Sequence, residues 1–406
     1  MMGLCDCNNF FASSERVFRP DLSECGIVVL SNNDGIIVAA DKKAKSLGFK
    51  RGKCWFEVKD SAMDLNIKAF SSNYTLYQDL SNRVMNTLSS LCPEIEPYSI
   101  DEAFFSIPAE ISAAKLREKV TNSTGIPVSI GYARTKTLVK AASKIAKEQR
   151  DFSFELKEEK EDEVLANLPI SDVWGIGWAW AEKLPKIGIR NAKSLRDMDD
   201  EYVLSNYPIT LLRTIYELRG IDAHKESDAR ITLQSGITFK EPVQSLDGMI
   251  RCLTVQAEAL AGKLKEKKLL AGTFAISFFT SRFLENHQAP YAAIRLPHHT
   301  NYLPNFAKAI EIATPRIYQD GRYKGCRVFA FDLVDEVDRQ YSLFDHRERI
   351  DKEDRLSSTV SEINRKYGRA SIHVGQSAGQ TKADLMKREM RSPAYTTRFE
   401  ELCPVY

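Results

Sequence analysis

Two adjacent carboxylates, Asp101 and Glu102, interrupt an apolar, β-prone stretch that follows Pro93 and Pro97. An ionised carboxylate is costly to bury without a cation or hydrogen bonds, so a strand interior has little use for such a pair. Neighbouring residues of a strand also point to opposite faces of the sheet. The pair is therefore predicted at a hairpin bend, where both carboxylates can reach one site.

A third acid, Asp6, closes a short apolar run that begins at Met2. Three carboxylates on two strands supply the oxygen ligands that a pair of Mg²⁺ ions needs, with water and substrate phosphates completing each shell. Any one of these acids taken alone is better explained as a turn residue, because Asp is common in turns. Together with the motifs below, they predict a site for two Mg²⁺ ions at Asp6, Asp101 and Glu102.

The 406-residue chain is too long for one ordinary core and predicts about two to four domains. Its 43% hydrophobic and 28% charged residues are typical of a soluble globular protein. No apolar run could span a bilayer and no signal-like segment follows Met1, so we expect a cytoplasmic protein without a membrane partner. The eight cysteines include no CxxC pair, which indicates reduced thiols rather than a zinc site or a disulfide framework.

The distribution of charge is more informative than the net charge of +2. Residues 240–327 contain 13 Lys and Arg against 7 Asp and Glu, whereas residues 332–345 are acidic. This segregation predicts a basic, DNA-facing module followed by a solvated linker.

The first 150 residues alternate strand-like and helix-like patterns. Strands are expected at 2–7, 26–30, 36–40 and 127–133, and helices at 41–47, 74–91, 111–123 and 137–147. The second and third strands are predicted to form a hairpin around the Asp34-Gly35 turn. The order of the elements outside this hairpin predicts a ferredoxin-like sheet with its helices on one side.

Two sets of lysines each share a helical face. At 100° per residue, one face of the helix at 137–147 carries Lys136, Lys140, Lys144 and Lys147. Lys42 and Lys45 lie three residues apart on the short helix at 41–47. The pair Lys42 and Lys45 is explained either as an ordinary solvated face or as a grip on phosphates.

A Gly-x-Gly pair, Gly175 and Gly177, stands between short helical patterns, with Gly188 and Ile189 behind it. Backbone N–H groups in such a hairpin can contact a phosphate without interference from side chains. The pair alone is weak evidence, but its helical setting predicts sequence-independent contact with a duplex.

A second α+β module is expected from residue 240 to about residue 333.

With these motifs assembled, the whole chain resembles the Y-family of translesion DNA polymerases, and within it the UmuC branch. The resemblance rests on residues 4–6 with 11–13, on the turn at 31–35, on 98–104, and on the tail at 386–390 and 392–398. The family's DinB branch does not share this tail.

The resemblance implies an α+β, multidomain fold with a ferredoxin-like palm, small fingers, a helix-hairpin-helix thumb and an α+β little finger. The implied boundaries are palm 1–20 and 74–165, fingers 21–73, thumb 166–232, linker 233–239, little finger 240–339, and clamp-binding peptide and partner-binding tail 340–406.

The implied activity is error-prone synthesis past damaged template by two-metal-ion nucleotidyl transfer, in SOS repair and mutagenesis. The implied site residues are Asp6, Asp101, Glu102 and the backbone carbonyl of Cys7 for the metals; Lys42, Lys45 and Lys147 for the triphosphate; Phe11 as the sugar gate; Ile36 and Val38 for the nascent base pair; Gly175, Gly177, Lys136, Lys140 and Lys144 for the DNA backbone; and Gln340, Leu343 and Phe344 for the clamp. The implied partners are primer-template DNA, deoxynucleoside triphosphates, a sliding clamp, a processed UmuD dimer and RecA, at the nucleoid.

Three positions depart from the family pattern. Phe11 replaces the usual Tyr, so the bulk of the gate remains without its hydroxyl. Lys42 stands where some relatives have Tyr, and Ile237 stands where an Arg usually contacts the template backbone. The tail beyond Phe344 has too few large apolar residues for a core of its own, so we expect it to order only on binding a partner.

Two other functions were weighed against the polymerase. A nucleotide cyclase can use a similar palm, but it would lack the thumb hairpin, the little finger and the clamp peptide. A non-catalytic DNA-binding scaffold would have lost the acids or the phosphate lysines, yet Asp6, Asp101, Glu102, Lys45 and Lys147 are all present.

Overall fold

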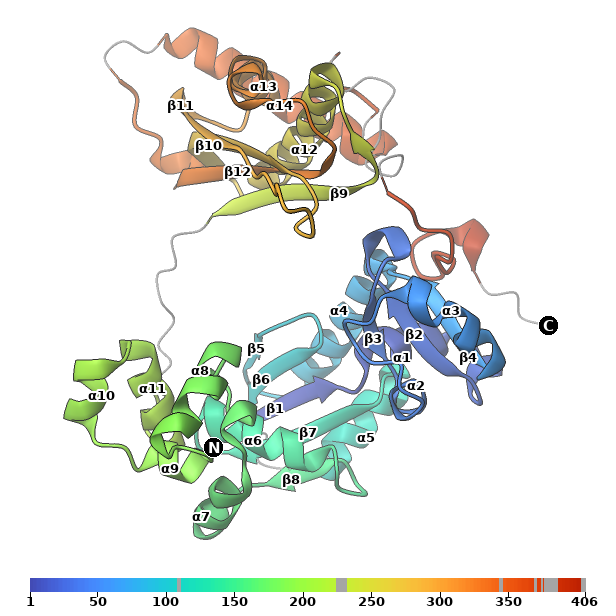
Figure 1. The fold of residues 1–406 in the computed structure, drawn as a ribbon, viewed down its shortest axis with the longest axis vertical. Helices are drawn as coiled ribbons and strands as arrows, with labels where there is room; N and C mark the ends of the chain where they lie inside the picture. Colours follow the sequence, from blue (N-terminus) through green and yellow to red (C-terminus); the bar gives the residue numbers. More distant parts are fainter. Residues whose placement is uncertain are drawn as a thin grey trace. The chain divides into compact units, whose positions relative to one another are not determined.

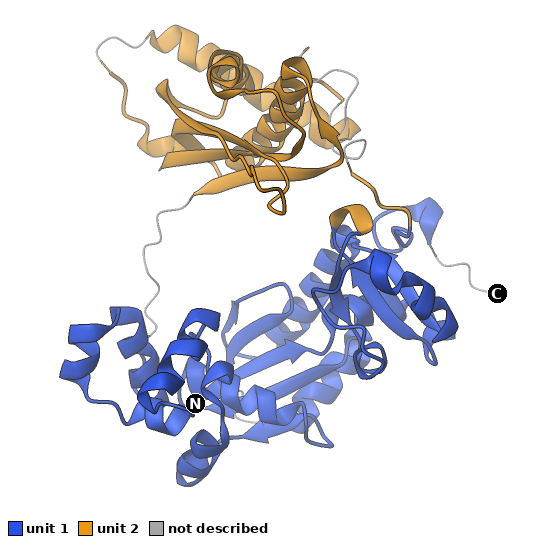
Figure 2. Ribbon diagram, viewed as in Figure 1, with its two compact units in different colours: residues 1–31, 35–227, 390–406 blue, residues 32–34, 228–389 orange. Residues whose placement is uncertain are grey.

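The computed structural model describes residues 1–107, 111–223, 232–342, 346–368, 371–373, 375 and 386–402. The chain forms two compact units, one of residues 1–31, 35–227 and 390–406 and one of residues 32–34 and 228–389 (Figure 2). Leu343 and Phe344 of the expected clamp peptide lie outside the described residues.

A five-stranded sheet forms the centre of the first unit (Figure 1). Its strands, in spatial order, are β5 (Ile95–Pro97), β6 (Glu102–Ser106), β1 (Met2–Cys7), β7 (Val128–Ala133) and β8 (Ser153–Glu155). β1 lies between β6 and β7 and is antiparallel to both, while β8 is parallel to β7. The sheet confirms the predicted strands at 2–7 and 127–133.

Helices cover both faces of this sheet, so the expectation of helices on one side is wrong. They are α4 (Tyr74–Leu91), α5 (Ala113–Thr124) and α6 (Lys136–Ala146). Leu4 of β1 belongs to the core formed with α6, whereas its neighbour Cys5 belongs to the core formed with α4 and α5. The physical reason is that successive residues of β1 are apolar, so both faces of the strand need cover.

Gly131 of β7 brings α6 close to the sheet. A Cβ at this position would lie 2.4 Å from the backbone nitrogen of Ser143 on α6. Only glycine allows this approach, which sets the helix directly over the strands that carry the predicted carboxylates.

A three-stranded sheet lies beside the first, with spatial order β3 (Ile37–Ala40), β2 (Gly26–Leu30) and β4 (Ile67–Ser71). Its helices are α1 (Phe10–Val17), α2 (Lys42–Ser46) and α3 (Trp55–Asp64). The hairpin of β2 and β3 is confirmed, but its loop is longer than a two-residue turn. The left-handed residues are Asn33 (φ 66°) and Asp34 (φ 51°), whereas Gly35 has a φ of −85°.

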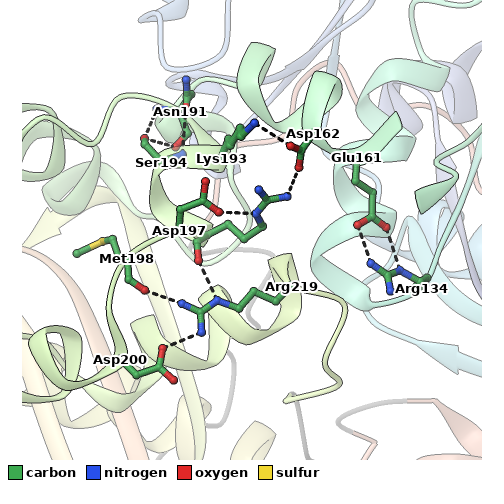
Figure 3. A network of polar contacts seen from close by, with 11 residues as sticks. Arg134, Glu161, Asp162, Asn191, Lys193, Ser194, Asp197, Met198, Asp200 and Arg219 are labelled. Atoms are coloured by element: carbon green, nitrogen blue, oxygen red, sulfur yellow. Dashed lines mark hydrogen bonds and ion pairs between the residues drawn. The ribbon is translucent and has the colours of Figure 1, made fainter. Parts of the chain in front are cut away.

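A group of short helices follows the palm-like sheet in the chain. They are α7 (Glu158–Asn167), α8 (Trp178–Lys183), α9 (Ala192–Arg196), α10 (Asp200–Asn206) and α11 (Ile209–Leu218). Figure 3 shows a polar network that joins α7, α9, α10 and the end of α11: Arg219 donates to Asp200 and to the carbonyls of Arg196 and Met198. Lys193 and Arg196 both bind Asp162, and these two contacts lower the pKa of that carboxyl to about 2.

The second unit is a four-stranded sheet with α12 (Leu246–Glu266) and α13 (Leu303–Ile317) packed on it. Its strands, in spatial order, are β11 (Tyr291–Thr300), β10 (Leu269–Phe279), β12 (Tyr323–Asp335) and β9 (Leu233–Val243). Residues 233–239, expected as a linker, form the first half of β9 and pair with β12. Ile237, where the family has Arg, is buried in this core.

The C-terminal tail is folded in two places, so the expectation that it orders only on binding is wrong for those residues. α14 (Arg347–Tyr367) joins the second unit, where Asp354 binds both terminal nitrogens of the Arg339 guanidinium, at 2.6 and 3.0 Å. Residues 390–398 join the first unit, and Ser392, Ala394 and Tyr395 are buried there. Polar contacts and a few buried apolar side chains, Ile350 and Tyr395 among them, hold these segments in place.

No helix among the described residues is long and apolar enough to cross a membrane.

Candidate active site

Two of the three predicted carboxylates lie side by side at one end of the five-stranded sheet. Asp6 of β1 and Glu102 of β6 are direct partners in the antiparallel register. Asp101 lies in the bend between β5 and β6, and its carbonyl accepts the N–H of Cys7 at 2.8 Å. The bend predicted from the pair of acids is confirmed, and it brings Asp6 and Glu102 to the face of the sheet that α6 covers.

The lysines of α6 point to these acids. Lys147 donates to Asp6 and Lys140 to Glu102, each at 2.6 Å. Lys136 donates to both oxygens of Glu96 at 2.6 Å, and Lys144 pairs with Asp172. The shared face predicted from the periodicity is confirmed, but its partners could not be predicted, because a period identifies a face and not what lies opposite.

Aromatic rings surround the Lys140 ammonium. Its Nζ lies 4.7 Å from the ring centroid of Tyr98, and 5.8 Å from those of Phe104 and Trp174. A cation over such rings is stabilised by their electron-rich faces. Sequence reasoning missed this contribution of Tyr98 and Trp174, although each stands beside a motif that it singled out.

The two opposed carboxylates differ in their affinity for a proton. Burial raises the pKa of Asp6 to about 6 against the lowering effect of Lys147, and the nearby Glu102 adds to the rise. Burial also acts on Glu102, but the hydrogen bonds and charges of Lys140, Asp6 and Lys147 hold its pKa below the ordinary value. Burial raises the pKa of the Cys7 thiol, which disfavours its thiolate form.

The residues fit a hard divalent cation in their chemistry. Asp6 and Glu102 share a hydrogen bond in a mostly buried place, and carboxylate oxygens are the donors that Mg²⁺ prefers. Within the described ranges, no three His, Cys, Asp or Glu side chains are already grouped around one point. The reason is that lysines hold two of the carboxylates, while Asp101 accepts from Ser99 Oγ at 2.6 Å.

The structure brings two of the three expected triphosphate lysines to the first strand. Lys147 is at Asp6, and Lys45 donates to the Asn9 side chain at 2.6 Å. Asn9 precedes α1 in a left-handed conformation, which turns the chain back just after the first acid. Lys42 lies exposed on α2.

Phe11 is half-buried in a group of aromatic rings. It stacks on Tyr77 with ring centroids 4.6 Å apart and 16° between the planes, and Tyr74 meets it edge-on at 5.9 Å. Its neighbour Phe10 is a core residue. Ile36, just before β3, is 41% exposed, and Val38 within β3 is half-buried.

The Gly-x-Gly pair has two different environments. Gly175 has a φ of 89°, and a Cβ there would meet Thr214 Oγ1 at 2.7 Å, so the backbone itself requires glycine. Gly177 precedes α8, and a Cβ there would meet no atom within 4 Å. Its backbone is therefore open to a large ligand.

Family models match most of the chain. The model described as the impB/mucB/samB family covers residues 5–144, and its C-terminal domain covers 231–343. The HHH motif of the same family covers 158–189, and a domain of unknown function covers 354–405.

Two curated relatives match over almost their full length, and a third matches over about two thirds. Protein UmuC of Salmonella typhimurium is 34% identical over 100% of both chains, and protein ImpB of the same organism is 34% identical over 99% of both. DNA polymerase IV of Brucella melitensis is 28% identical over 68% of this chain and 64% of its own.

Solved structures share the fold. The Y-family DNA polymerase chimera of Dbh and Dpo4 has a TM-score of 0.66 at 18% identity, and the insertion ternary complex of Dbh DNA polymerase has 0.55 at 19%. Each match covers 82% of this chain and 100% of the other. Together with the full-length relatives, they show that this chain belongs to the impB/mucB/samB family and is a UmuC-like Y-family translesion DNA polymerase.

Proposed function

We propose that the site at Asp6, Asp101 and Glu102 holds two Mg²⁺ ions and adds deoxynucleotides to a primer opposite damaged template. The observation that carries this proposal is the direct register of Asp6 with Glu102, with Asp101 in the adjoining bend. The backbone carbonyl of Cys7, next to Asp6, completes the proposed ligand set.

The chemistry divides between metals and protein. Divalent ions held by these residues would lower the pKa of a primer 3′-OH and offset the negative charge of the triphosphate and of the departing pyrophosphate. The protein fixes the carboxylates by strand register, and Lys42, Lys45 and Lys147 bind the triphosphate. Lys147 reaches the site from the end of α6, where its charge faces Asp6. No side-chain base is required.

The nucleotide pocket is assigned to two groups of residues. Phe11 lies under the deoxyribose and leaves no room for a 2′-hydroxyl, while Ile36 and Val38 cover the nascent base pair. The stacking of Phe11 on Tyr77 supports this role, because a ring held on one face makes a rigid wall.

The DNA backbone is assigned to Gly175, Gly177, Lys136, Lys140 and Lys144. The open backbone at Gly177 and the 45% exposure of the Lys144 side chain support the assignment most directly. Lys136 and Lys140 are mostly buried against Glu96 and Glu102, so we assign the first phosphate contact of α6 to Lys144.

The domains follow the family pattern in this proposal. The palm comprises 1–20 and 74–165, the fingers 21–73, the thumb 166–232 and the little finger 240–339. The described part of the second unit has both strands and helices, in keeping with an α+β little finger.

We also propose that the chain acts at the nucleoid with a sliding clamp, a processed UmuD dimer and RecA. Gln340, Leu343 and Phe344 would bind the clamp. Replacing Leu343 and Phe344 together with Ala should abolish clamp-stimulated synthesis and spare synthesis on short primers. Equal loss of both activities would mean that these residues serve the fold and not the clamp.

The cyclase alternative lacks support, because the matched HHH motif and C-terminal domain have no place in it. The scaffold alternative is tested by activity. Primer extension on damaged and undamaged template, with Mg²⁺ and with EDTA, should give metal-dependent products on both. A protein that binds primer-template but gives no product with any of the proposed partners would favour the scaffold.

A further inference from the structure

Residues 390–398 of the tail are fastened to the edge strand of the three-stranded sheet. Arg391 forms a parallel bridge with Ser71 at the end of β4. Ser71 N–H donates to the Met390 carbonyl at 3.0 Å, and Met390 N–H donates to Ser71 Oγ at 3.0 Å. The tail thus adds one parallel bridge to the edge of the sheet.

The next residues are held by the start of α4. The buried Asn73 side chain donates from Nδ2 to Ser392 Oγ at 2.9 Å, to the Ser392 carbonyl at 3.2 Å and to the Pro393 carbonyl at 3.3 Å. Its Oδ1 accepts from Arg391 at 3.3 Å. A buried amide that meets its partners in this way fixes the segment in one register.

Tyr395 anchors the far side of the segment. Its ring is 7% exposed and stacks on Phe18, which follows α1, with centroids 4.8 Å apart and 19° between the planes. Tyr395 belongs to the same core cluster as Phe10 and Tyr77. The tail therefore spans from β4 and α4 to the end of α1.

The residue that holds Ser392 is also bonded to Tyr77. The carbonyl of Asn73 accepts the N–H of Tyr77 at 3.0 Å, while its side chain donates to Ser392. The Tyr77 hydroxyl in turn donates to Oε1 of the fully buried Glu15 of α1 at 2.6 Å. Burial raises the pKa of Glu15 against the lowering effects of Tyr77, Ser392 and Arg391.

Tyr77 connects Glu15 to the proposed nucleotide pocket. Its ring is the one on which Phe11 stacks, and both Tyr77 and Glu15 are inaccessible to solvent. A displacement of Glu15 or Tyr77 would shift the ring that supports Phe11, because close-packed interiors transmit small movements.

We propose that tail residues Arg391 and Ser392 are positioning residues for sugar selection, acting through Asn73 and Tyr77 on Phe11. The proposal rests on the proposed role of Phe11 as the sugar gate. The catalytic carboxylates lie elsewhere, so the tail should affect the choice between ribonucleotide and deoxyribonucleotide more than the rate of deoxynucleotide addition.

The test is the ratio of kcat/KM for a deoxynucleotide to that for the matching ribonucleotide, measured by single-nucleotide primer extension with the full chain. Ser392→Ala and Tyr77→Phe should each lower this ratio about fivefold, as expected for one hydrogen bond. For Ser392→Ala, the kcat for the deoxynucleotide should change less than about twofold. The lower ratio should come from a lower KM for the ribonucleotide. Ser392→Thr, which keeps the hydroxyl, should restore the ratio.

Two controls separate the outcomes. Ser90→Ala makes the same change at the exposed, opposite end of α4 and should leave the ratio unaltered. Phe11→Ala tests the gate itself: an unchanged ratio there would overturn the proposed pocket. If Phe11→Ala lowers the ratio but Ser392→Ala and Tyr77→Phe do not, the gate stands and the tail serves only the fold.

Discussion

Asp6 and Glu102 lie directly opposite each other on antiparallel strands, and each meets a different lysine of α6 at 2.6 Å. The seat of α6 on the sheet therefore controls the surroundings of both carboxylates. That seat depends on Gly131, where the helix and strand backbones are in contact.

Gly131→Ala should destabilise the first unit. The new Cβ would lie 2.4 Å from the Ser143 nitrogen, a backbone atom that cannot turn away, so we expect a loss of about 1–3 kcal/mol in chemical denaturation. Gly262→Ala in α12 is the control, since its Cβ meets no atom within 4 Å and a helical alanine is favourable. Equal stability of the two variants would contradict the close approach.

Phe11→Ala should raise ribonucleotide incorporation far more than it lowers deoxynucleotide incorporation. Removing the ring opens the space that a 2′-hydroxyl needs, and a change of about tenfold or more in the kcat/KM ratio is expected. Phe10→Leu is the matched control, because Phe10 is a core residue that should alter stability and not the ratio.

Affinity for primer-template should fall steeply with salt and vary little with duplex sequence, because the proposed contacts are to phosphates. Lys144→Ala should weaken binding and reduce the slope of log affinity against log salt by about one. Lys119→Ala on α5, which covers the other face of the sheet, should change neither. A strong preference for one duplex sequence at fixed salt would count against this grip.

Stability should depend on pH through Glu15. Its pKa in the folded protein is raised above 4.5, so the folded state keeps the proton longer than the unfolded chain. The wild type should therefore lose stability as the pH rises from about 4.5 through the raised pKa. Glu15→Gln cannot titrate, so its free energy of unfolding should improve relative to wild type over that window. Tyr77→Phe removes a contact that lowers this pKa and should extend the loss to higher pH.

Much of the fold could be predicted from local pattern. The helix at 74–91 has the predicted bounds, because its apolar period is long and uninterrupted. The bend at Asp101 and Glu102 was predictable because two charges cannot continue a buried strand. The strand order and register beyond that bend depend on pairing between distant segments, which no local pattern contains.

The site was less predictable where partners are remote in sequence. Asn73 and Ser392 are 319 residues apart, and neither belongs to an apolar pattern. The low hydrophobicity of the tail predicts disorder, yet polar contacts and one stacked ring hold residues 390–398. The pairing of Lys140 with Glu102 was missed for a similar reason, since the two residues are 38 positions apart and the lysine period does not say which residue lies opposite.

The most direct test of the account is single-turnover nucleotide incorporation by Asp101→Asn and Glu102→Gln, with primer-template binding measured in parallel. Each variant should lose at least about a thousandfold in rate, because a lost metal ligand removes several kcal/mol of transition-state stabilisation. DNA binding should stay nearly intact. Glu96→Gln, on the same face of the sheet and paired with Lys136, should keep a rate close to wild type. Near-normal incorporation by either carboxylate variant would contradict the assignment of the site.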